Sequence, residues 1–473
     1  MANRRDFLKT SAGAVIAAAT TRPLFGFQGA NNRIRMGVIG MGTRAARVFD
    51  SLTRHEDCQF TVGCEVVQAK LQSFQHPEAN GRPARPFAAS LPIVGDYRRV
   101  LDRNDIDAVL IATPDFSHAK IMVDAVAAGK DVYVEKPVSN SIPRINAMLA
   151  AYQKSNRVVQ VGTHQRSWDH FIEAKKILDS GVLGPVSHVI IQQAGNYAQP
   201  KQEPVPVPPG VDWDAWEVDA PKKPFKQGYL AFRGWWEYGS GLVGDWGAHH
   251  VDVANWFMNA DQKQPLKTAA LGMMAAPDRD PECVPDTFSI SWQYDNWMMT
   301  FENSEIPRPA DDIEGWGVYF VSGRGVLQVN RMGYALRPSV PKTQNKQGVA
   351  PPPGAGNVQG IGAAPAPGAP GGGAPGSGAP GGGGRGGRGG GANANLPPVV
   401  ANVFLNPKGG VEEDYPLHVH TRNFLDCVKD RKKPNAPMEI GYNSALPCLL
   451  ALEAMQKGRV IGWDPATKSS KVV

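Results

Sequence analysis

The sequence has few cysteines, and their spacing excludes several kinds of site. The chain of 473 residues has five cysteines and no C-x-x-C pair, so a zinc site built on closely spaced thiolates is not expected. The cysteines are widely scattered and odd in number, which argues against a disulfide framework. We therefore expect buried, free thiols at Cys58, Cys64, Cys283, Cys427 and Cys448.

The sequence also has little excess charge. Its formal net charge is +6, and the basic residues Arg4, Arg5, Lys9 and Arg22 against Asp6 supply half of this near the N-terminus. A chain without that segment has a weak charge, which gives no reason to expect nucleic acid or an anionic membrane as a partner. The length and the hydrophobic content of 42% predict two domains with cores of their own.

Residues 1–30 are a segment of a different kind. Arg4 and Arg5 precede a Phe-Leu pair and a short Ala/Val/Ile stretch that is too brief to span a bilayer. The segment resembles a twin-arginine signal, which implies export of the folded protein by the twin-arginine machinery to the periplasm or beyond. The alternative is an amphipathic helix or an uncleaved anchor. An exported enzyme must bind a cytoplasmic cofactor before it leaves, so we expect tight binding of any such cofactor.

A strand, a glycine turn and a helix are predicted from Ile34 onward. The apolar run IRMGVI leads into GMGTRA, and apolar residues at helical spacing follow. Gly40, Gly42 and Ala45 occupy the three small positions of the G-x-G-x-x-G/A pattern, which permit a tight turn, close approach of a pyrophosphate and packing of the helix on the strand. Alone, the pattern also fits a purely structural turn.

This turn predicts a bound dinucleotide with its pyrophosphate at the helix N-terminus. Met41, Thr43 and Arg44 belong to the same turn and are expected to contact the dinucleotide. The next apolar run ends at Glu65, about twenty residues past the glycines, where a carboxylate can bind a ribose 2′-hydroxyl and repel a 2′-phosphate. The position of Glu65 therefore favours NAD over NADP.

Alternating strands and helices continue to about residue 160. They predict a parallel sheet with right-handed crossovers, which binds ligands at the carboxyl ends of its strands. Polar and proline residues follow two of these predicted strands, IDAVLIA and DVYVEKP. The candidates at these strand ends are Thr113, Pro114, His118, Glu135, Lys136 and Pro137.

The pattern changes after Gly162. Runs such as DTFSISWQY, WMMTFEN and GVYFVSG alternate as strands do and predict an open, mostly antiparallel sheet with helices on one side. We expect residues 31–160 to form a Rossmann domain, and residues 161–344 with 398–473 to form an α+β domain for substrate and oligomer contacts. Residues 345–397 are nearly all Gly, Ala, Pro, Asn and Arg and are expected to form a disordered insert.

A segment of the second domain is dense in aromatic residues, in the run WEVDAPKKPFKQGYLAFRGWWEYG. Aromatic faces pack on the C–H faces of sugar rings, and a guanidinium can bond their hydroxyls. Most of these aromatics are expected to pack the loop itself. The substrate-binding candidates are His164, Arg166, Arg233, Trp235 and Tyr238.

Five motifs together resemble the glucose-fructose oxidoreductase, inositol dehydrogenase and rhizopine-catabolism (Gfo/Idh/MocA) family. They are GVIGMG, ATPDFSH, AGKDVYVEKPVS, VVQVGTHQRS and GDWGAHHVD, in this order. The resemblance implies a Rossmann domain, a second domain whose open sheet makes a homodimer or homotetramer, and an EKP lysine that contacts nicotinamide and substrate. It also implies an Asp-x-x-x-His pair, which Asp245 and His249 match.

Residues four apart on a helix share one face, so Asp245 and His249 are expected to project together. We expect His249 to accept a hydroxyl proton, Lys136 to polarise the oxygen, and Asp245 to orient or tune the imidazole. No metal site is expected, because the adjacent His249 and His250 point about 100° apart on a helix.

Three functions remain open at the level of sequence. The first is an exported, NAD-dependent oxidoreductase that transfers hydride at a secondary alcohol of a carbohydrate. The second is a redox-assisted glycosidase or lyase, in which transient oxidation permits elimination with no net consumption of NAD; some members of the resembling family work in this way. The third is a non-catalytic sugar-binding protein that keeps the fold, against which Lys136, Asp245 and His249 weigh.

Overall fold

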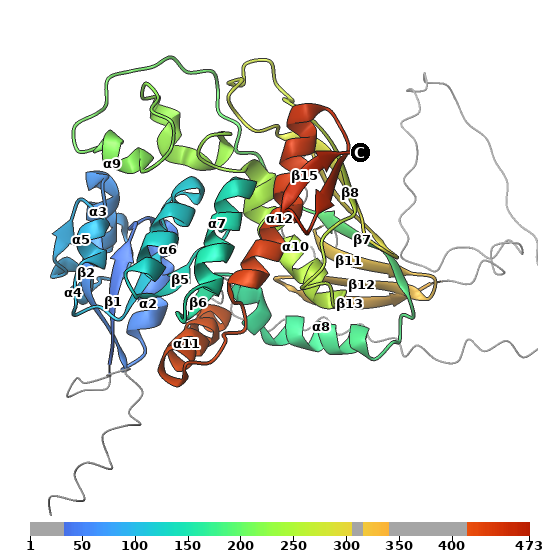
Figure 1. Ribbon diagram of the computed structural model, residues 1–473, viewed down its shortest axis with the longest axis horizontal. Coiled ribbons are helices and arrows are strands. Elements are labelled where there is room, and N and C mark those ends of the chain that lie inside the picture. The colour runs from blue at the N-terminus through green and yellow to red at the C-terminus, as the bar shows by residue number, and fades with distance from the viewer. Residues whose placement is uncertain (1–32, 305–315, 340–413) are drawn as a thin grey trace, which may run out of the picture.

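The computed structural model describes residues 33–304, 316–339 and 414–473, which form two domains (Figure 1). The predicted signal at 1–30 and the predicted insert at 345–397 lie outside these residues. All five cysteines are buried and free, as expected. Within the three described ranges, no helix is both long and apolar enough to cross a membrane, and no group of His, Cys, Asp and Glu is arranged to hold a metal ion.

The first domain is built on a six-stranded parallel sheet with strand order β3-β2-β1-β4-β5-β6. The strand bounds are β1 Ile34–Ile39, β2 Cys58–Cys64, β3 Ile93–Val94, β4 Ala108–Ile111, β5 Asp131–Val134 and β6 Val159–Val161. Strands β1, β4 and β5 are almost entirely buried, because helices cover both faces of the sheet. This is the predicted Rossmann arrangement.

Helices connect these strands and carry the polar strand ends into position. Their bounds are α2 Thr43–Thr53, α3 Gln68–Gln75, α4 Pro86–Ala89, α5 Arg98–Leu101, α6 His118–Ala127 and α7 Ile142–Gln153, with short 3-10 helices η1 at Pro77–Asn80 and η2 at Asp115–Ser117. Helix α2 turns Ala45, Val48, Phe49 and Leu52 onto the sheet. That helix follows directly from the glycine turn, so the turn faces the carboxyl ends of β1 and β4.

The second domain is an open sheet of nine strands in the order β13-β12-β11-β7-β10-β9-β8-β14-β15. Neighbouring strands of this sheet run antiparallel, except that β7 and β10 run parallel to each other. The bounds are β7 Val186–Gln192, β8 Lys267–Met273, β9 Thr287–Gln293, β10 Met298–Asn303, β11 Gly317–Ser322, β12 Gly325–Asn330, β13 Gly333–Pro338, β14 Ile461–Asp464 and β15 Ser469–Val472. The sequence prediction of a mostly antiparallel sheet is confirmed.

Three helices pack on this sheet, namely α8 Asp169–Asp179, α10 Gly241–Phe257 and α12 Met438–Lys457. Two others, α9 Trp213–Glu217 and α11 Asp414–Asp430, lie against the first domain (Figure 1). The short 3-10 helices are η3 His164–Ser167 and η4 Gln227–Gly234. Helix α11 returns to the first domain and packs on α2, where Arg422 pairs with Asp57 at 2.7 Å. The last part of the chain therefore ties both domains together (Figure 1).

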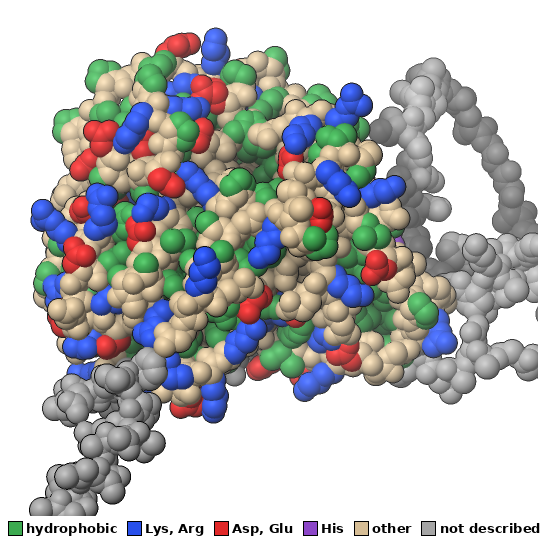
Figure 2. All heavy atoms as spheres, viewed as in Figure 1, with side chains coloured by type: hydrophobic (Ala, Val, Ile, Leu, Met, Phe, Trp, Pro, Cys, Tyr) green, Lys and Arg blue, Asp and Glu red, His purple; other side chains and the backbone are tan. Residues whose placement is uncertain are grey.

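The outer face of the nine-stranded sheet carries exposed apolar side chains. Leu271 is 76% exposed, Met273 is 62% exposed and Met298 is 39% exposed. Basic and acidic side chains are scattered over the face of the molecule shown in Figure 2.

Candidate active site

A cavity of about 900 Å³ lies at the carboxyl ends of the parallel strands, between the two domains. Its walls come from the glycine turn, the ends of β2, β4 and β5, helix α10, and the long connection between β7 and α10. Most of the predicted site residues line it. These are Gly40, Gly42, Thr43, Arg44, Glu65, Thr113, Pro114, His118, Glu135, Lys136, His164, Arg233, Asp245 and His249.

The glycine turn is shaped for close approach of a ligand. Gly40 has φ +80°, and a Cβ built on it would lie 2.8 Å from the backbone nitrogen of Thr113. Gly42 starts α2, and a Cβ built there meets no atom within 4 Å. A side chain at Gly42 would therefore point into the cavity, while the first N–H groups of α2 have no side-chain cap.

Glu65 fixes this turn from the end of β2. Its Oε2 accepts a hydrogen bond from the Met41 amide at 2.8 Å, and its Oε1 accepts from the Val66 amide at 2.8 Å and the Val67 amide at 2.9 Å. The carboxylate retains a lone pair toward the cavity, because a carboxylate has about four acceptor positions. The side chain of Met41 is buried in the core of the first domain, its amide donates to Glu65, and Met41 does not line the cavity, so the predicted cofactor contact of its side chain has no support in the structure.

An ion pair between Arg44 and Glu135 braces the cavity wall. Arg44 Nε donates to Glu135 Oε1 at 2.9 Å, and its Nη2 lies 3.2 Å from His164 Nδ1. A Cβ on Gly162 would fall 2.5 Å from Glu135 Oε1, so glycine leaves the space that the carboxylate fills. Arg44 therefore connects the first helix to the ends of β5 and β6.

His118 holds two loops together at the cavity wall. Its ring nitrogens lie 2.8 Å from the carbonyl oxygens of Pro137 and Thr113. Burial lowers the pKa of His118 to about 4, although both carbonyls oppose this. Burial opposes a charge on the ring and the two carbonyl acceptors favour one, and the contacts with both carbonyls fix the Lys136-Pro137 segment.

Asp245 is the centre of the polar cluster at the inner end of the cavity. Lys136 Nζ donates to Asp245 Oδ1 at 2.7 Å and to its carbonyl oxygen at 3.0 Å. The Tyr197 hydroxyl donates to Asp245 Oδ2 at 2.6 Å, and Arg233 Nε lies 3.3 Å from Oδ1. Burial alone would raise the pKa of Asp245, but the two cations and the hydrogen bonds outweigh it and hold that pKa well below its usual range.

His249 lies one turn further along α10 and lines the same cavity. It is 4% exposed, and its Nδ1 has no hydrogen-bond partner among the described residues. Burial, with Lys136 adding a smaller effect, keeps the pKa of His249 well below its usual value. Asp245 and His249 line the same cavity, as expected. The expected contact by which the carboxylate orients the imidazole is absent, because Asp245 bonds to Lys136, Arg233 and Tyr197 instead.

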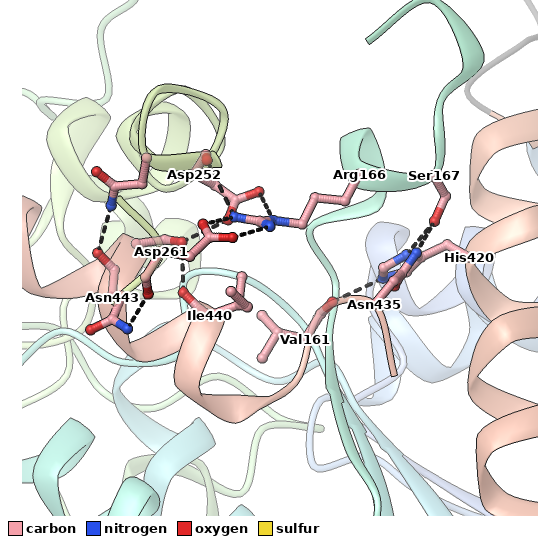
Figure 3. A network of polar contacts seen from close by, with 11 residues as sticks. Val161, Arg166, Ser167, Asp252, Asp261, His420, Asn435, Ile440 and Asn443 are labelled. Atoms are coloured by element: carbon pink, nitrogen blue, oxygen red, sulfur yellow. Dashed lines mark hydrogen bonds and ion pairs between the residues drawn. The ribbon is translucent and has the colours of Figure 1, made fainter. Parts of the chain in front are cut away.

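Arg166 is not a substrate residue in this structure. Its guanidinium is buried, 2.9 Å from Asp252 and 2.6 Å from Asp261, and points toward these two carboxylates (Figure 3). Arg166 does not line the cavity. Ser444 also donates to Asp252 at 2.8 Å. The prediction that Arg166 binds substrate is corrected, because its guanidinium forms ion pairs with two carboxylates of the second domain.

Trp235 and Tyr238 are also corrected. They are 1% and 0% exposed, belong to a buried aromatic cluster, and do not themselves line the cavity. Trp235 Nε1 donates to the Gly228 carbonyl at 2.8 Å, and the Tyr229 and Tyr238 rings lie 4.9 Å apart. Burial of large apolar rings explains their position.

The structure adds cavity residues that the sequence did not indicate. Tyr197 and Trp246 supply aromatic surface beside Asp245, and Lys70 and Asp115 supply charged or polar groups. Burial raises the pKa of Asp115 to about 7. Trp246 lies in the GDWGAHHVD motif and Asp115 in the ATPDFSH motif, so membership of a quoted motif was a signal for these two residues.

The residues present fit a dinucleotide. The absence of a side chain at Gly42 leaves open space for a bound group. The uncapped N–H groups of α2 suit a pyrophosphate. Glu65 retains an acceptor position for a ribose hydroxyl. The unpartnered Nδ1 of His249 is a buried polar atom that a bound molecule would satisfy.

The chain belongs to the Gfo/Idh/MocA oxidoreductase family. Residues 34–163 match its "NAD-binding Rossmann fold" and residues 170–314 match its "C-terminal alpha/beta domain", which together cover more than half of the chain.

Individual relatives are similar over shorter stretches. An inositol 2-dehydrogenase of Gluconacetobacter diazotrophicus is 35% identical over 106 residues, which are 22% of this chain and 32% of that protein. A glycosyl hydrolase family 109 protein of Solibacter usitatus is 30% identical over 152 residues, which are 30% of this chain and 34% of that protein. The chain thus aligns with about a third of the length of either relative.

The fold is also that of solved structures. The WlbA dehydrogenase of Bordetella pertussis, in complex with NADH and UDP-GlcNAcA, superposes with a TM-score of 0.57 over 91% of this chain and 99% of that chain. The two sequences are 14% identical, so this likeness concerns the fold.

Proposed function

We propose that the protein is an NAD-dependent oxidoreductase that transfers hydride at a secondary alcohol of a sugar or polyol. The observation that supports this most is the convergence of Lys136, Asp245 and His249 in a cavity that the glycine turn borders. The matched NAD-binding family and the inositol dehydrogenase among its relatives agree with it.

In this proposal the neutral imidazole of His249 accepts the hydroxyl proton of the substrate. Lys136, held by Asp245, donates a hydrogen bond to the same oxygen and stabilises the charge that develops there. Tyr197 and Arg233 keep the Asp245 carboxylate ionised and in place. When bound, the nicotinamide supplies the hydride acceptor or donor.

The aromatic walls suit a carbohydrate. Trp246, Tyr197 and Phe232 line the cavity near the polar cluster, and aromatic faces pack well against the C–H faces of sugar rings. His164 and Arg233 line the same part of the cavity and supply polar groups for sugar hydroxyls.

The proposal also covers the cellular location and the oligomeric state of the enzyme. Arg4 and Arg5 favour export in folded form through the twin-arginine machinery to the periplasm, and NAD carried outward would have to be held tightly. The exposed Leu271, Met273 and Met298 favour a homodimer or homotetramer through the open sheet. Light scattering of the purified protein tests the assembly, and the mass of the protein recovered from the periplasm tests export.

A second candidate is a redox-assisted glycosidase that cycles its NAD in place. The similarity to a glycosyl hydrolase family 109 protein favours it. Product analysis separates the two: net release of an aglycone without change in NADH supports the glycosidase, and a stoichiometric change in NADH supports the oxidoreductase.

The direct test starts from the purified protein. The small molecule released on denaturation is identified by its ultraviolet spectrum and mass, and the protein is then assayed against a panel of sugars, polyols and glycosides. Lys136→Ala is expected to abolish turnover while the folded protein is recovered. Unchanged turnover in this variant rejects the assignment of the site and, with it, a catalytic role for the cluster.

A further inference from the structure

The long connection between β7 and α10, residues 193–240, reaches across from the second domain to the first. We call it the crossover segment. Asp212 N donates to the Val66 carbonyl at 3.0 Å, and Gln68 N donates to the Gly210 carbonyl at 2.8 Å. Val67 and Val211 form a β-bridge between these bonds. Helix α9 of the segment therefore lies beside α3, as Figure 1 shows.

A second anchor fixes the crossover segment on the other side of the cavity. Phe116 of the first domain lies 5.2 Å from the Trp216 ring and 5.2 Å from the Tyr238 ring. Arg144 Nη1 donates to the Phe116 carbonyl at 2.7 Å, and its Nη2 lies 3.3 Å from Asp219. Between the two anchors the segment supplies part of the cavity wall, with Asp214, Ala215, Trp216, Leu230 and Arg233 among its residues.

Lys70 lies on α3, two residues after the Gln68 amide of the first anchor. Its side chain is half-buried and lines the same cavity as Gly40 and Gly42. No carboxylate of the described ranges pairs with its ammonium. Burial lowers the pKa of Lys70, Glu65 opposes this, and Arg233 adds to it. A cation in this position is stabilised by an anionic ligand in the cavity.

We propose that Lys70 pairs with the pyrophosphate of the dinucleotide and that the crossover segment closes over it, so that the cofactor stays bound through repeated turnovers. The inference rests on the proposed function and concerns how that cofactor is held. The glycine turn contacts a pyrophosphate from the α2 side. In this proposal Lys70 supplies a further positive charge in the same cavity, and the two anchors hold the crossover segment in place beside it.

The test measures retention of the nucleotide instead of activity. Wild-type protein, Lys70→Ala, Lys70→Arg and Lys154→Ala are purified, and the nicotinamide nucleotide in each is counted after denaturation. The rate of loss is then measured by dilution into excess isotope-labelled NAD. A charge-assisted hydrogen bond predicts that Lys70→Ala loses NAD about 10- to 100-fold faster than wild type. Lys70→Arg restores most of the retention, and Lys154→Ala, an exposed lysine of the same domain, behaves as wild type.

The crossover segment is tested by Gln68→Pro. Proline is tolerated at the first position of a helix, so α3 persists while the bond to the Gly210 carbonyl is lost. Faster loss of NAD is expected in this variant also. Higher salt should speed the loss from wild type more than from Lys70→Ala, because screening weakens the ion pair.

The outcomes separate the two proposals. Equal loss of NAD from Lys70→Ala and wild type overturns the pairing, and a raised KM for an acidic sugar in that variant would assign Lys70 to the substrate instead. Rapid exchange in the wild type overturns retention while the proposed function stands. A wild-type protein that binds no nicotinamide nucleotide in direct titration overturns both.

Discussion

Lys136 Nζ lies 2.7 Å from Asp245 Oδ1 and 3.0 Å from the carbonyl oxygen of the same residue. One residue on α10 therefore holds the lysine at two points. The pair links the end of β5 in the first domain to the second domain, so the relative position of the domains and the position of the ammonium are set together.

Asp245→Asn tests this link. The amide keeps the shape but removes the charge that Lys136 and Arg233 face, so we expect kcat to fall about 100-fold. We also expect a loss of about 3 kcal/mol in the free energy of unfolding, because Lys136 and the more exposed Arg233 lose the buried anion that they share. Steady-state kinetics and urea denaturation measure the two effects. Asp214→Asn alters an exposed carboxylate of the same cavity and should change neither.

Tyr197→Phe removes one hydrogen bond from the same carboxylate. Since Lys136 and Arg233 still hold Asp245, we expect a smaller effect, with kcat/KM lowered about 10-fold and the unfolding free energy lowered by about 1 kcal/mol. The pH dependence of kcat/KM should shift in the variant, because the carboxylate that faces Lys136 loses a donor. An unshifted profile with wild-type kcat/KM would show that the hydroxyl has only a packing role.

Arg166→Met tests the structural role assigned to Arg166. Removal of the guanidinium leaves Asp252 buried without its cation, so we expect a loss of about 3 to 5 kcal/mol in unfolding free energy. The KM of the protein that remains folded should be unchanged, since Arg166 does not line the cavity. A raised KM with wild-type stability would restore Arg166 as a substrate residue. A variant that does not fold is replaced by Asp261→Asn, which weakens the outer, more exposed ion pair only.

The site residues that could be located from the sequence are those that belong to short local motifs. An apolar run followed by glycines marks the end of β1, and EKP after an apolar run marks the end of β5, so Gly40, Glu65 and Lys136 could be placed at one edge of the sheet. Parallel strand ends meet at that edge whatever their separation in sequence. Local pattern was sufficient for them.

The errors concern pairings over long sequence distances. Arg166 and Asp252 are 86 residues apart, and nothing local indicates that they meet. Asp245 and His249 share a helix face, yet Tyr197, from the crossover segment, competes for the carboxylate. The aromatic density near Trp235 was visible in the sequence, but the direction of each ring was not, because packing of the cluster decides it.

The two glycines of the turn should respond differently to substitution. Gly42→Val places a side chain in open space with an unstrained backbone, so we expect wild-type stability and NAD binding weakened at least about 10-fold. Gly40→Val combines φ +80° with a clash at Thr113 and should lose about 3 kcal/mol or more of stability. Calorimetric NAD titration and thermal unfolding distinguish them. Wild-type NAD affinity in Gly42→Val would contradict a pyrophosphate over this turn.

The stability of the fold should fall in mild acid. Burial lowers the folded-state pKa of seven histidines below the usual 6.5, which are His55, His118, His164, His170, His249, His250 and His420. The unfolded chain then binds more protons than the folded chain below pH 6.5. The stabilisation is therefore complete above pH 6.5 and is lost as the pH falls toward about 4.

His170 isolates one contribution to this pH dependence. It lies outside the cavity lining, its Nε2 donates to the Asn330 carbonyl at 2.7 Å, and its pKa is lowered by burial to about 4. Linkage predicts that this residue alone destabilises the fold by about 2 kcal/mol between pH 8 and pH 5. His170→Asn should flatten the measured dependence of unfolding free energy on pH by that amount, although the variant is less stable at pH 8. A melting temperature that stays constant from pH 8 to pH 5 in the wild type would contradict the lowered pKa of these seven imidazoles, that of His249 included.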